Sequence, residues 1–437
     1  MISPYRVRKL LAPTRGLQKA VALFALGLFA FLMGAGLSFK EVLLPILQWA
    51  SGMTRRAVSQ MVPQGEADYA MHLLGGAFLL AGGYLVYRGV RSAANHVLET
   101  FNPGLTTGKM DVYLRRQQLA QGPRIVALGG GTGLSTLLRG LKQHSSNITA
   151  VVTVTDDGGS SGVLVKDKGM IPPGDIRNCL VALSDAEKAM TDLFQHRFKD
   201  DSGSLSGHSI GNLFIAGLVD QAKGNFEKAV QIASDILAIR GRVLPATLEH
   251  VRLRAELEDG TEVCGETSIV RAGRRIAKLH LDPESPEAHH AAIEAIRSAD
   301  LVCIGPGSVY TSVIPNLLVP GIADALLECH CPRVYICNVM TQPGESDDFS
   351  ASEHVRTIMQ QLDGRKVFDQ VLVNTGVPSS SAIDKYQSTG AHLVEADVDR
   401  LRTMGFRVLP GNYVSETDVV RHDPMKVASR LLQLVER

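Results

Sequence analysis

Three loops rich in glycine, aspartate or proline, each near an apolar run, constrain the fold of this 437-residue chain most. The first is GGGTG at 129–133, after the apolar run RIVAL, and the second is DDGGSSG at 156–162, after AVVTVT. The third is PPGD at 172–175. A buried strand that turns through glycine into a helix directs backbone N–H groups and the positive end of the helix dipole at whatever lies above the turn. The pattern predicts a doubly wound, mostly parallel α/β sheet of Rossmann type, in three layers, with a site for phosphate groups.

The three loops contribute candidate binding residues of different kinds. Asp156 and Asp157 follow the second strand, where a doubly wound sheet places the acid that binds ribose, and carboxylates there also suit a hydrated divalent cation. A solvated turn is the alternative for these two. Arg177 offers a planar fork for phosphate oxygens, or else a salt bridge to Asp175. The candidates from this region are Gly130, Gly131, Thr132, Gly133, Asp156, Asp157, Gly158, Asp175, Arg177 and Asn178.

Later segments add polar groups at further predicted strand ends. The run to Ile304 leads into GPGS and repeats the geometry of the first turn. In SGHSIGNL, at 206–213, a binding role for His208 is favoured over a catalytic one, because no acidic partner is assignable. No catalytic residue is therefore named. The candidates from these segments are His208, Asn212, Gly305, Pro306, Gly307, Ser308, Thr311, Asn338, Thr341, Gln342 and Asn374.

Residues 243–282 change character, because Val251, Leu253 and Ala255 alternate with charged residues. Asp259-Gly260 then supplies the residues of a tight hairpin turn. We expect a small β-rich insert within a nucleotide-binding domain that spans 122–437.

The chain also begins with two long apolar stretches. Residues 20–39 contain no charged side chain. A helix of this length can cross a hydrocarbon layer of about 30 Å. A second predicted span covers about 70–88, so that 1–90 is predicted to be a transmembrane hairpin and 91–121 a juxtamembrane linker. Arginine and lysine flank the pair, which predicts a multi-pass anchor in the cell membrane with both chain ends in the cytoplasm.

The charge balance and the cysteines argue against nucleic-acid binding, disulfide bonds and a zinc-finger site. The formal net charge is +1 and no basic stripe is interleaved with aromatic residues, so nucleic-acid binding has no support. The six cysteines follow the second predicted span, in a reducing compartment, and are expected to be free thiols. Cys329, His330 and Cys331 have no second ligand pair at zinc-finger spacing, and no metal ligand is assigned.

The motif order resembles one family along roughly 124–437. The segments are GGGTGLSTLLRGL, TVTDDGGSSG, PPGDIRN, SGHSIGNL, IGPGSVYTSVIPNLLV and CNVMTQPGES, and they resemble the gluconeogenesis factors, or YvcK-like proteins, which are related to the CofD phospholactate transferases. The resemblance implies binding of a UDP-sugar, UDP-N-acetylglucosamine, by a regulatory factor that links carbon metabolism to cell-wall precursor supply and cell shape. It implies no established reaction.

The same resemblance suggests roles for the candidates. The glycines of 130–133 and 305–308 would hold the diphosphate, Asp156 and Asp157 the ribose or Mg²⁺, and Arg177 a phosphate oxygen. Asn338, Thr341, Gln342 and Asn374 suit uracil or sugar recognition.

Two alternatives stay open. One is an Mg²⁺-dependent transferase, similar to the phospholactate transferases, that uses a nucleotide-activated substrate. The other is an NAD-binding oxidoreductase, for which no proton-relay pair is assignable. The sequence does not locate a surface for a regulatory protein partner, and it leaves a homodimer open.

Overall fold

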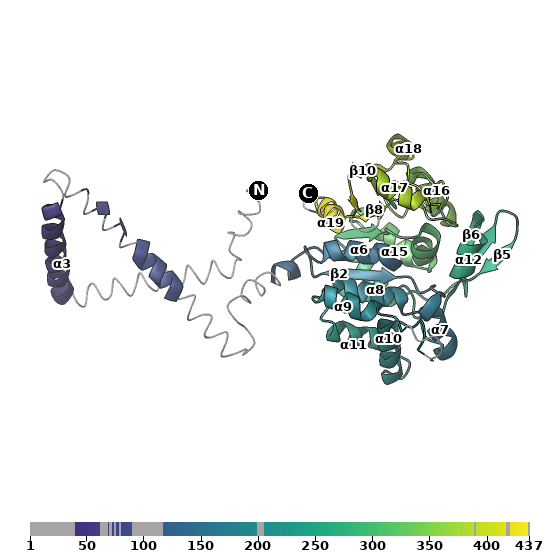
Figure 1. Cartoon of the computed structure of the whole chain (residues 1–437), viewed down its shortest axis with the longest axis horizontal. Coiled ribbons are helices and arrows are strands. Elements are labelled where there is room, and N and C mark those ends of the chain that lie inside the picture. Colours follow the sequence, from purple (N-terminus) through teal and green to yellow (C-terminus); the bar gives the residue numbers. More distant parts are fainter. Residues whose placement is uncertain are drawn as a thin grey trace. The chain divides into compact units, whose positions relative to one another are not determined.

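The computed structural model describes residues 40–61, 69, 72–73, 76–77, 80–89, 117–198, 205–388, 390–416 and 420–435. The chain divides into two compact units, Met1–Met110 and Asp111–Arg437 (Figure 1). We describe each unit by itself.

The first unit contains the helix α3, Lys40–Met61, with Pro45 inside it and with Leu44, Trp49 and Met53 exposed. The first predicted span, 20–39, lies outside the described residues, and so does part of the second. Among the described residues, no single helix is long and apolar enough to cross a membrane. A bent pair in the second unit, Val309–Leu318 and Ile322–Glu328, passes by length and composition, and it is largely buried in the core. The predicted transmembrane hairpin thus gains no support from this part of the chain.

The second unit is built on a seven-stranded sheet in the order β10-β9-β8-β7-β1-β2-β3, in which all neighbouring strands are parallel. The strands are β1 Ile125–Gly129, β2 Ile148–Val152, β3 Arg242–Pro245, β7 Leu301–Ile304, β8 Arg333–Ile336, β9 Gln370–Asn374 and β10 Arg407–Gly411. The chain runs outward from β1 to β3 and then resumes at β7 on the other side of β1. This confirms the predicted Rossmann-like α/β sheet and places its switch point between β1 and β7.

Helices cover both faces of the sheet because successive strand residues point to opposite sides. Ile125 and Ala127 belong to one core cluster, whereas Val126 and Leu128 belong to the other. The first cluster includes residues of α6 Gly131–Leu141, α8 Gly174–Leu183, α9 Glu187–Gln195, α10 Ile210–Gln221, α11 Phe226–Ile236 and α19 Pro424–Leu432. The second includes residues of α13 His290–Arg297, α14 Ile314–Leu318, α15 Ile322–Glu328, α16 Ala351–Gln361 and α18 Val398–Thr403.

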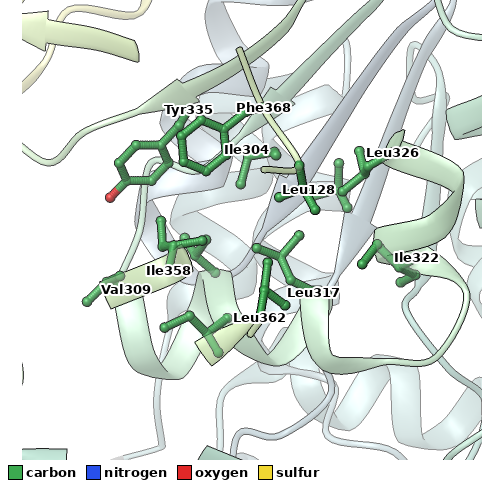
Figure 2. Packing of buried hydrophobic residues seen from close by; sticks show 14 of the residues in the cluster. Leu128, Ile304, Val309, Leu317, Ile322, Leu326, Tyr335, Ile358, Leu362 and Phe368 are labelled. Atoms are coloured by element: carbon green, nitrogen blue, oxygen red, sulfur yellow. The ribbon is translucent and has the colours of Figure 1, made fainter. Parts of the chain in front are cut away.

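Figure 2 shows the second core, where Leu128 and Ile304 of the sheet lie above Leu317 and Ile358 of the helices. Tyr335 and Phe368 stack there with ring centroids 5.3 Å apart. Burying a large apolar side chain of this kind contributes about 1.5–3 kcal/mol, so this double layer fixes the sheet on which the loops stand.

The insert is a three-stranded antiparallel sheet in the order β5-β4-β6. Its elements are β4 Arg252–Leu257, β5 Glu262–Cys264, α12 Glu266–Ala272 and β6 Ile276–Asp282. The hairpin turn at Asp259-Gly260 is present, with Gly260 at φ +79°. Residues 243–245 differ from the expectation, because Val243 pairs in parallel with β2 as part of β3. A short apolar strand of the main sheet and a strand of the insert have the same sequence pattern, so the insert begins after Pro245.

The remaining elements flank the carboxyl ends of the strands. They are α7 Gly159–Lys168, a π-helical turn Val309–Val313, α17 Ser380–Gln387, and the hairpin of β11 Val414–Glu416 and β12 Val420–His422. Helical periodicity in the sequence runs over 180–198 and 210–240, but each of these stretches is divided between two helices, α8 and α9 in the first and α10 and α11 in the second. Ser184 ends α8, and the left-handed residues Lys223 and Gly224 separate α10 from α11.

Candidate functional site

A cavity of about 440 Å³ lies at the switch point, where β1, β2, β7 and β8 end. Its size falls within the usual range of small-molecule sites, about 300–1,000 Å³. Of the residues proposed from sequence, it is lined by Gly130, Gly131, Thr132, Gly133, Asp156, Asp175, Pro306, Gly307, Ser308, Thr311, Asn338, Thr341 and Gln342.

Two glycine loops form the floor of this cavity and touch each other through their backbones. A Cβ added to Gly133 would lie only 2.7 Å from the carbonyl carbon of Pro306, so the loops approach as closely as they do because position 133 has no side chain. Gly131, at φ +58°, turns the chain into α6. Gly130 has no side chain to cap α6, and the Asp175 carboxylate takes the Gly131 N–H. The N–H groups that follow in the first turn, those of Thr132 and Gly133, face a ligand in the cavity.

Asn338 holds the second glycine loop in place. Its side-chain amide donates to the Gly307 carbonyl at 2.9 Å, and its oxygen accepts from the Gly307 N–H at 3.1 Å. Thr341 is fixed in a similar way, since its hydroxyl accepts from the His392 N–H at 2.9 Å. Both residues therefore shape the wall of the cavity.

Four carboxyl groups line the cavity: Asp156, Asp175, Glu266 and Glu345. Burial and, second to it, the nearby Asp156 together raise the pKa of Asp175 to about 6, against the opposing effect of the Gly131 N–H. Burial also raises the pKa of Glu345 to about 7, although Thr311 donates to it at 3.1 Å.

The pKa of Glu266 is raised more than that of Asp175 or Glu345. Burial, followed by repulsion from Asp156 and Asp175, raises its pKa to about 9. The cavity consequently holds protons at neutral pH that a divalent cation could replace.

Positive charge in the cavity is sparse. Among the described lining residues, Arg421 is the one permanent cation. His422 lies beside it, and burial lowers its pKa to about 4, which keeps it neutral at physiological pH. Arg421 and the backbone N–H groups are therefore the groups in this cavity that can attract a phosphate.

Comparison with known proteins assigns the chain to a family. The family model described as 2-phospho-L-lactate transferase CofD matches residues 125–414. The gluconeogenesis factor of Bacillus subtilis is 47% identical over 319 residues, which cover 73% of this chain and 100% of that relative. A gluconeogenesis-factor relative from Nostoc sp. is 44% identical over 430 residues, or 97% of this chain and 92% of the relative. The chain belongs to the gluconeogenesis factor family.

A solved structure extends the family assignment to the fold. The crystal structure of a Bacillus halodurans protein, described as a member of the UPF0052 family, has a TM-score of 0.68 and 46% identity. The match covers 71% of this chain and 99% of that protein.

Several predicted residues of this family member do not line the switch-point cavity. Asp157 points to the insert, where its carboxylate accepts from the Thr267 N–H at 2.9 Å and from the Thr267 hydroxyl at 2.7 Å. The Gly158 N–H donates to Asp156 at 3.0 Å. Gly305, the first residue of the second glycine loop, is buried. Asn374 binds the backbone of Gly376 and Tyr413.

Arg177 belongs to a buried polar cluster behind the cavity. Its guanidinium donates to Ser209 at 2.6 Å, to Asn212 at 2.8 Å and to Asn178 at 3.0 Å. In the same cluster Ser160 lies 3.0 Å from both His208 Nδ1 and Asn212 Nδ2. The cluster ties the first turns of α7, α8 and α10 together, and none of its members lines the cavity.

Sequence reasoning missed a further set of lining residues: Thr136, Glu266, Ser312, Val339, Met340, Glu345, Tyr386, Val420, Arg421 and His422. Glu345 stands in the quoted TQPGES motif, so a signal existed for it. Glu266, Tyr386 and Arg421 come from the insert, α17 and the β11–β12 hairpin, and no local pattern marks them. Within the described part of the chain, no group of three or more His, Cys, Asp or Glu side chains is arranged to hold a metal ion.

Proposed function

We propose that this family member binds a UDP-sugar, UDP-N-acetylglucosamine, in the switch-point cavity and acts as a regulatory protein. The regulated process is the supply of carbon to cell-wall synthesis and hence cell shape. One observation carries the proposal: two glycine loops in backbone contact, at the ends of β1 and β7, form a floor that suits a diphosphate.

The charges of the cavity suggest how a diphosphate is held. Arg421 and the N-terminus of α6 attract phosphate, whereas the carboxylates of Asp156 and Asp175 repel it. Oxygen ligands from carboxylates and phosphates together suit Mg²⁺, which usually keeps several waters. We therefore propose that Mg²⁺ accompanies the nucleotide sugar and replaces the protons of the cavity acids.

Calorimetric titration of residues 111–437 tests this proposal, with UDP-N-acetylglucosamine, GTP and NAD compared in the presence and absence of Mg²⁺. We expect the nucleotide sugar to bind best, and Mg²⁺ to strengthen it. Arg421→Gln should weaken binding about tenfold, the loss expected for one charge-assisted hydrogen bond. Arg400→Gln, at an exposed position of α18, is the matched control and should leave affinity unchanged. Preference for GTP or NAD would overturn the proposal.

A second candidate function is an Mg²⁺-dependent transferase that uses a nucleotide-activated substrate. It is favoured by the match over 125–414 to the family described as 2-phospho-L-lactate transferase, and by the four carboxyl groups in the cavity. Incubation with UDP-N-acetylglucosamine and analysis by mass spectrometry separates the two functions. Product that disappears with Asp156→Ala supports the transferase, and an unchanged nucleotide sugar supports the regulatory protein.

A further inference from the structure

A second cavity, of about 260 Å³, lies next to the first. It is enclosed by the residues that follow β2, by α7 and by the start of β4 in the insert. Asp156 lines both cavities, so a ligand group that binds this carboxylate has one cavity on either side of it. The second cavity lies below the usual volume range for a whole drug-sized ligand and suits one ring of a larger molecule.

The walls and the rim of the second cavity differ in chemistry. Val154, Val251 and Leu253 form apolar walls and are at most 4% exposed. Lys166, His250 and Arg252 stand at exposed positions around the rim. Asp157 also borders it, but its carboxylate is occupied by Thr267. A flat, weakly polar ring with hydrogen-bond acceptors on its edge matches this lining.

The sheet gives the second cavity a defined relation to the phosphate site. In a doubly wound sheet the phosphates lie over the first strand's turn and the ribose lies at the acid that ends the second strand. Asp156 follows β2 and borders both cavities, whereas Gly130, Gly131, Thr132 and Gly133 line the first cavity and not the second. The base attached to a ribose at Asp156 would therefore extend into the second cavity.

We propose that the second cavity binds the nucleobase, and that Arg252 and His250 select a base with carbonyl acceptors, as in uracil. The inference rests on the proposed UDP-sugar function and assigns the two ends of the ligand. The base lies between α7 and the insert, and the sugar lies in the first cavity with Thr341, Gln342 and Glu345.

The two rim residues match the edge of uracil. Arg252 donates hydrogen bonds only, which suits a carbonyl oxygen and opposes the amino group that cytosine carries in its place. Burial, followed by the neighbouring Arg252, lowers the pKa of His250, so that its ring is neutral and offers one donor and one acceptor. A neutral imidazole can accept the ring N–H of uracil.

Cys264 provides a native reporter for occupancy, because it is exposed and lines the second cavity. Iodoacetamide alkylation of residues 111–437, followed by mass spectrometry, measures its reaction rate. UDP at about ten times its Kd should slow alkylation of Cys264 about tenfold by occupying the cavity. N-acetylglucosamine 1-phosphate, which lacks the uridine, should not. The half-buried Cys331 lies outside both cavities and serves as the internal control.

Base selectivity supplies an independent measurement. Arg252→Gln should weaken UDP about tenfold and reduce the preference for UDP over CDP, since both nucleotides carry the same diphosphate. Arg271→Gln, on the exposed surface of α12, should change neither. UDP-N-acetylglucosamine that binds without protecting Cys264, or an unchanged UDP-to-CDP ratio in Arg252→Gln, would overturn the base assignment alone. Absence of UDP-N-acetylglucosamine binding to the unmodified protein would instead remove the proposed function, and the base assignment with it.

Discussion

Single residues set the protonation of the cavity, and Glu266 sets it most strongly. Its pKa is raised from 4.5 to about 9, so the folded chain keeps a proton that the unfolded chain loses near 4.5. The folded state binds more protons between these values, and stability therefore falls as pH rises through this window. The stabilising contribution is complete below 4.5 and is lost by about pH 9.

Glu266→Gln should remove this dependence, because glutamine stays neutral at every pH. We expect its thermal midpoint to match that of the unmodified protein near pH 4.5 and to exceed it increasingly as pH rises toward 9, since each pKa unit of the shift corresponds to about 1.4 kcal/mol. Thermal unfolding of ligand-free protein across this range measures the effect. Glu256→Gln, exposed on β4, should follow the unmodified curve. Identical curves for all three proteins would contradict a protonated Glu266 in the folded state.

At the scale of single residues, the sequence predicted the glycines of both loops and several polar residues of the cavity, but not the direction of every side chain. Asp156 was expected because it follows an apolar run, and it lines the cavity. Arg177 was expected to face a phosphate, yet its guanidinium is taken up by Ser209 and Asn212, which lie more than 30 positions along the chain. Glu266 is brought to the cavity by an insert whose sequence shows only alternation. Side-chain direction depends on contacts between distant segments, which no local pattern encodes.

Among the elements, the two glycine loops depend on each other. Gly133→Ala places a methyl group against the Pro306 carbonyl, which belongs to backbone and cannot move away without shifting the loop. We expect a loss of about 1–3 kcal/mol of stability together with weaker nucleotide-sugar binding. Gly217→Ala is the control with the opposite sign. It lies in open space on α10 and should stabilise by up to about 1 kcal/mol. Urea unfolding distinguishes them, and equal midpoints would argue against the loop contact.

The insert is held to the main sheet through Asp157 and Thr267. Thr267→Val removes the hydroxyl that donates at 2.7 Å and leaves the backbone donor in place. We expect hydrogen exchange in β4 and β6 to accelerate by about fivefold, the equivalent of about 1 kcal/mol. Ser268→Ala, at the exposed neighbouring position, should leave exchange unchanged. Exchange that accelerates equally in both variants would place the attachment elsewhere.

Sequence patterns predicted the strands of the main sheet better than they predicted the residues of the cavity. Apolar runs that end in glycine predicted β1 and β7 to within a residue, because a buried parallel strand needs continuous apolar residues. The breaks between α8 and α9 and between α10 and α11 were missed. Helical periodicity continues through Ser184 and Lys223, and the turn at each is imposed by the packing of the next helix.

For the whole molecule, we predict that the apolar segments 20–39 and 70–88 anchor the chain in a membrane. Full-length protein should pellet with membranes and resist carbonate extraction, because removing two such segments from lipid exposes a large apolar area to water. Residues 111–437 alone should stay in the supernatant, as the control for aggregation. Release of the full-length protein by carbonate would contradict the anchor.

The last helix of the chain lies against the first helix after β1. A Cβ on Gly140 of α6 would come within 3.0 Å of Ala428 Cβ on α19, and Leu137, Leu141, Val427 and Leu431 are buried in the same cluster. During synthesis α6 leaves the ribosome about 300 residues before its cover, since translation proceeds from the N-terminus. The nascent protein must keep that apolar surface from binding other chains until α19 emerges. A truncation that removes α19 would therefore be far more damaging than the distance of this helix from the nucleotide cavity suggests.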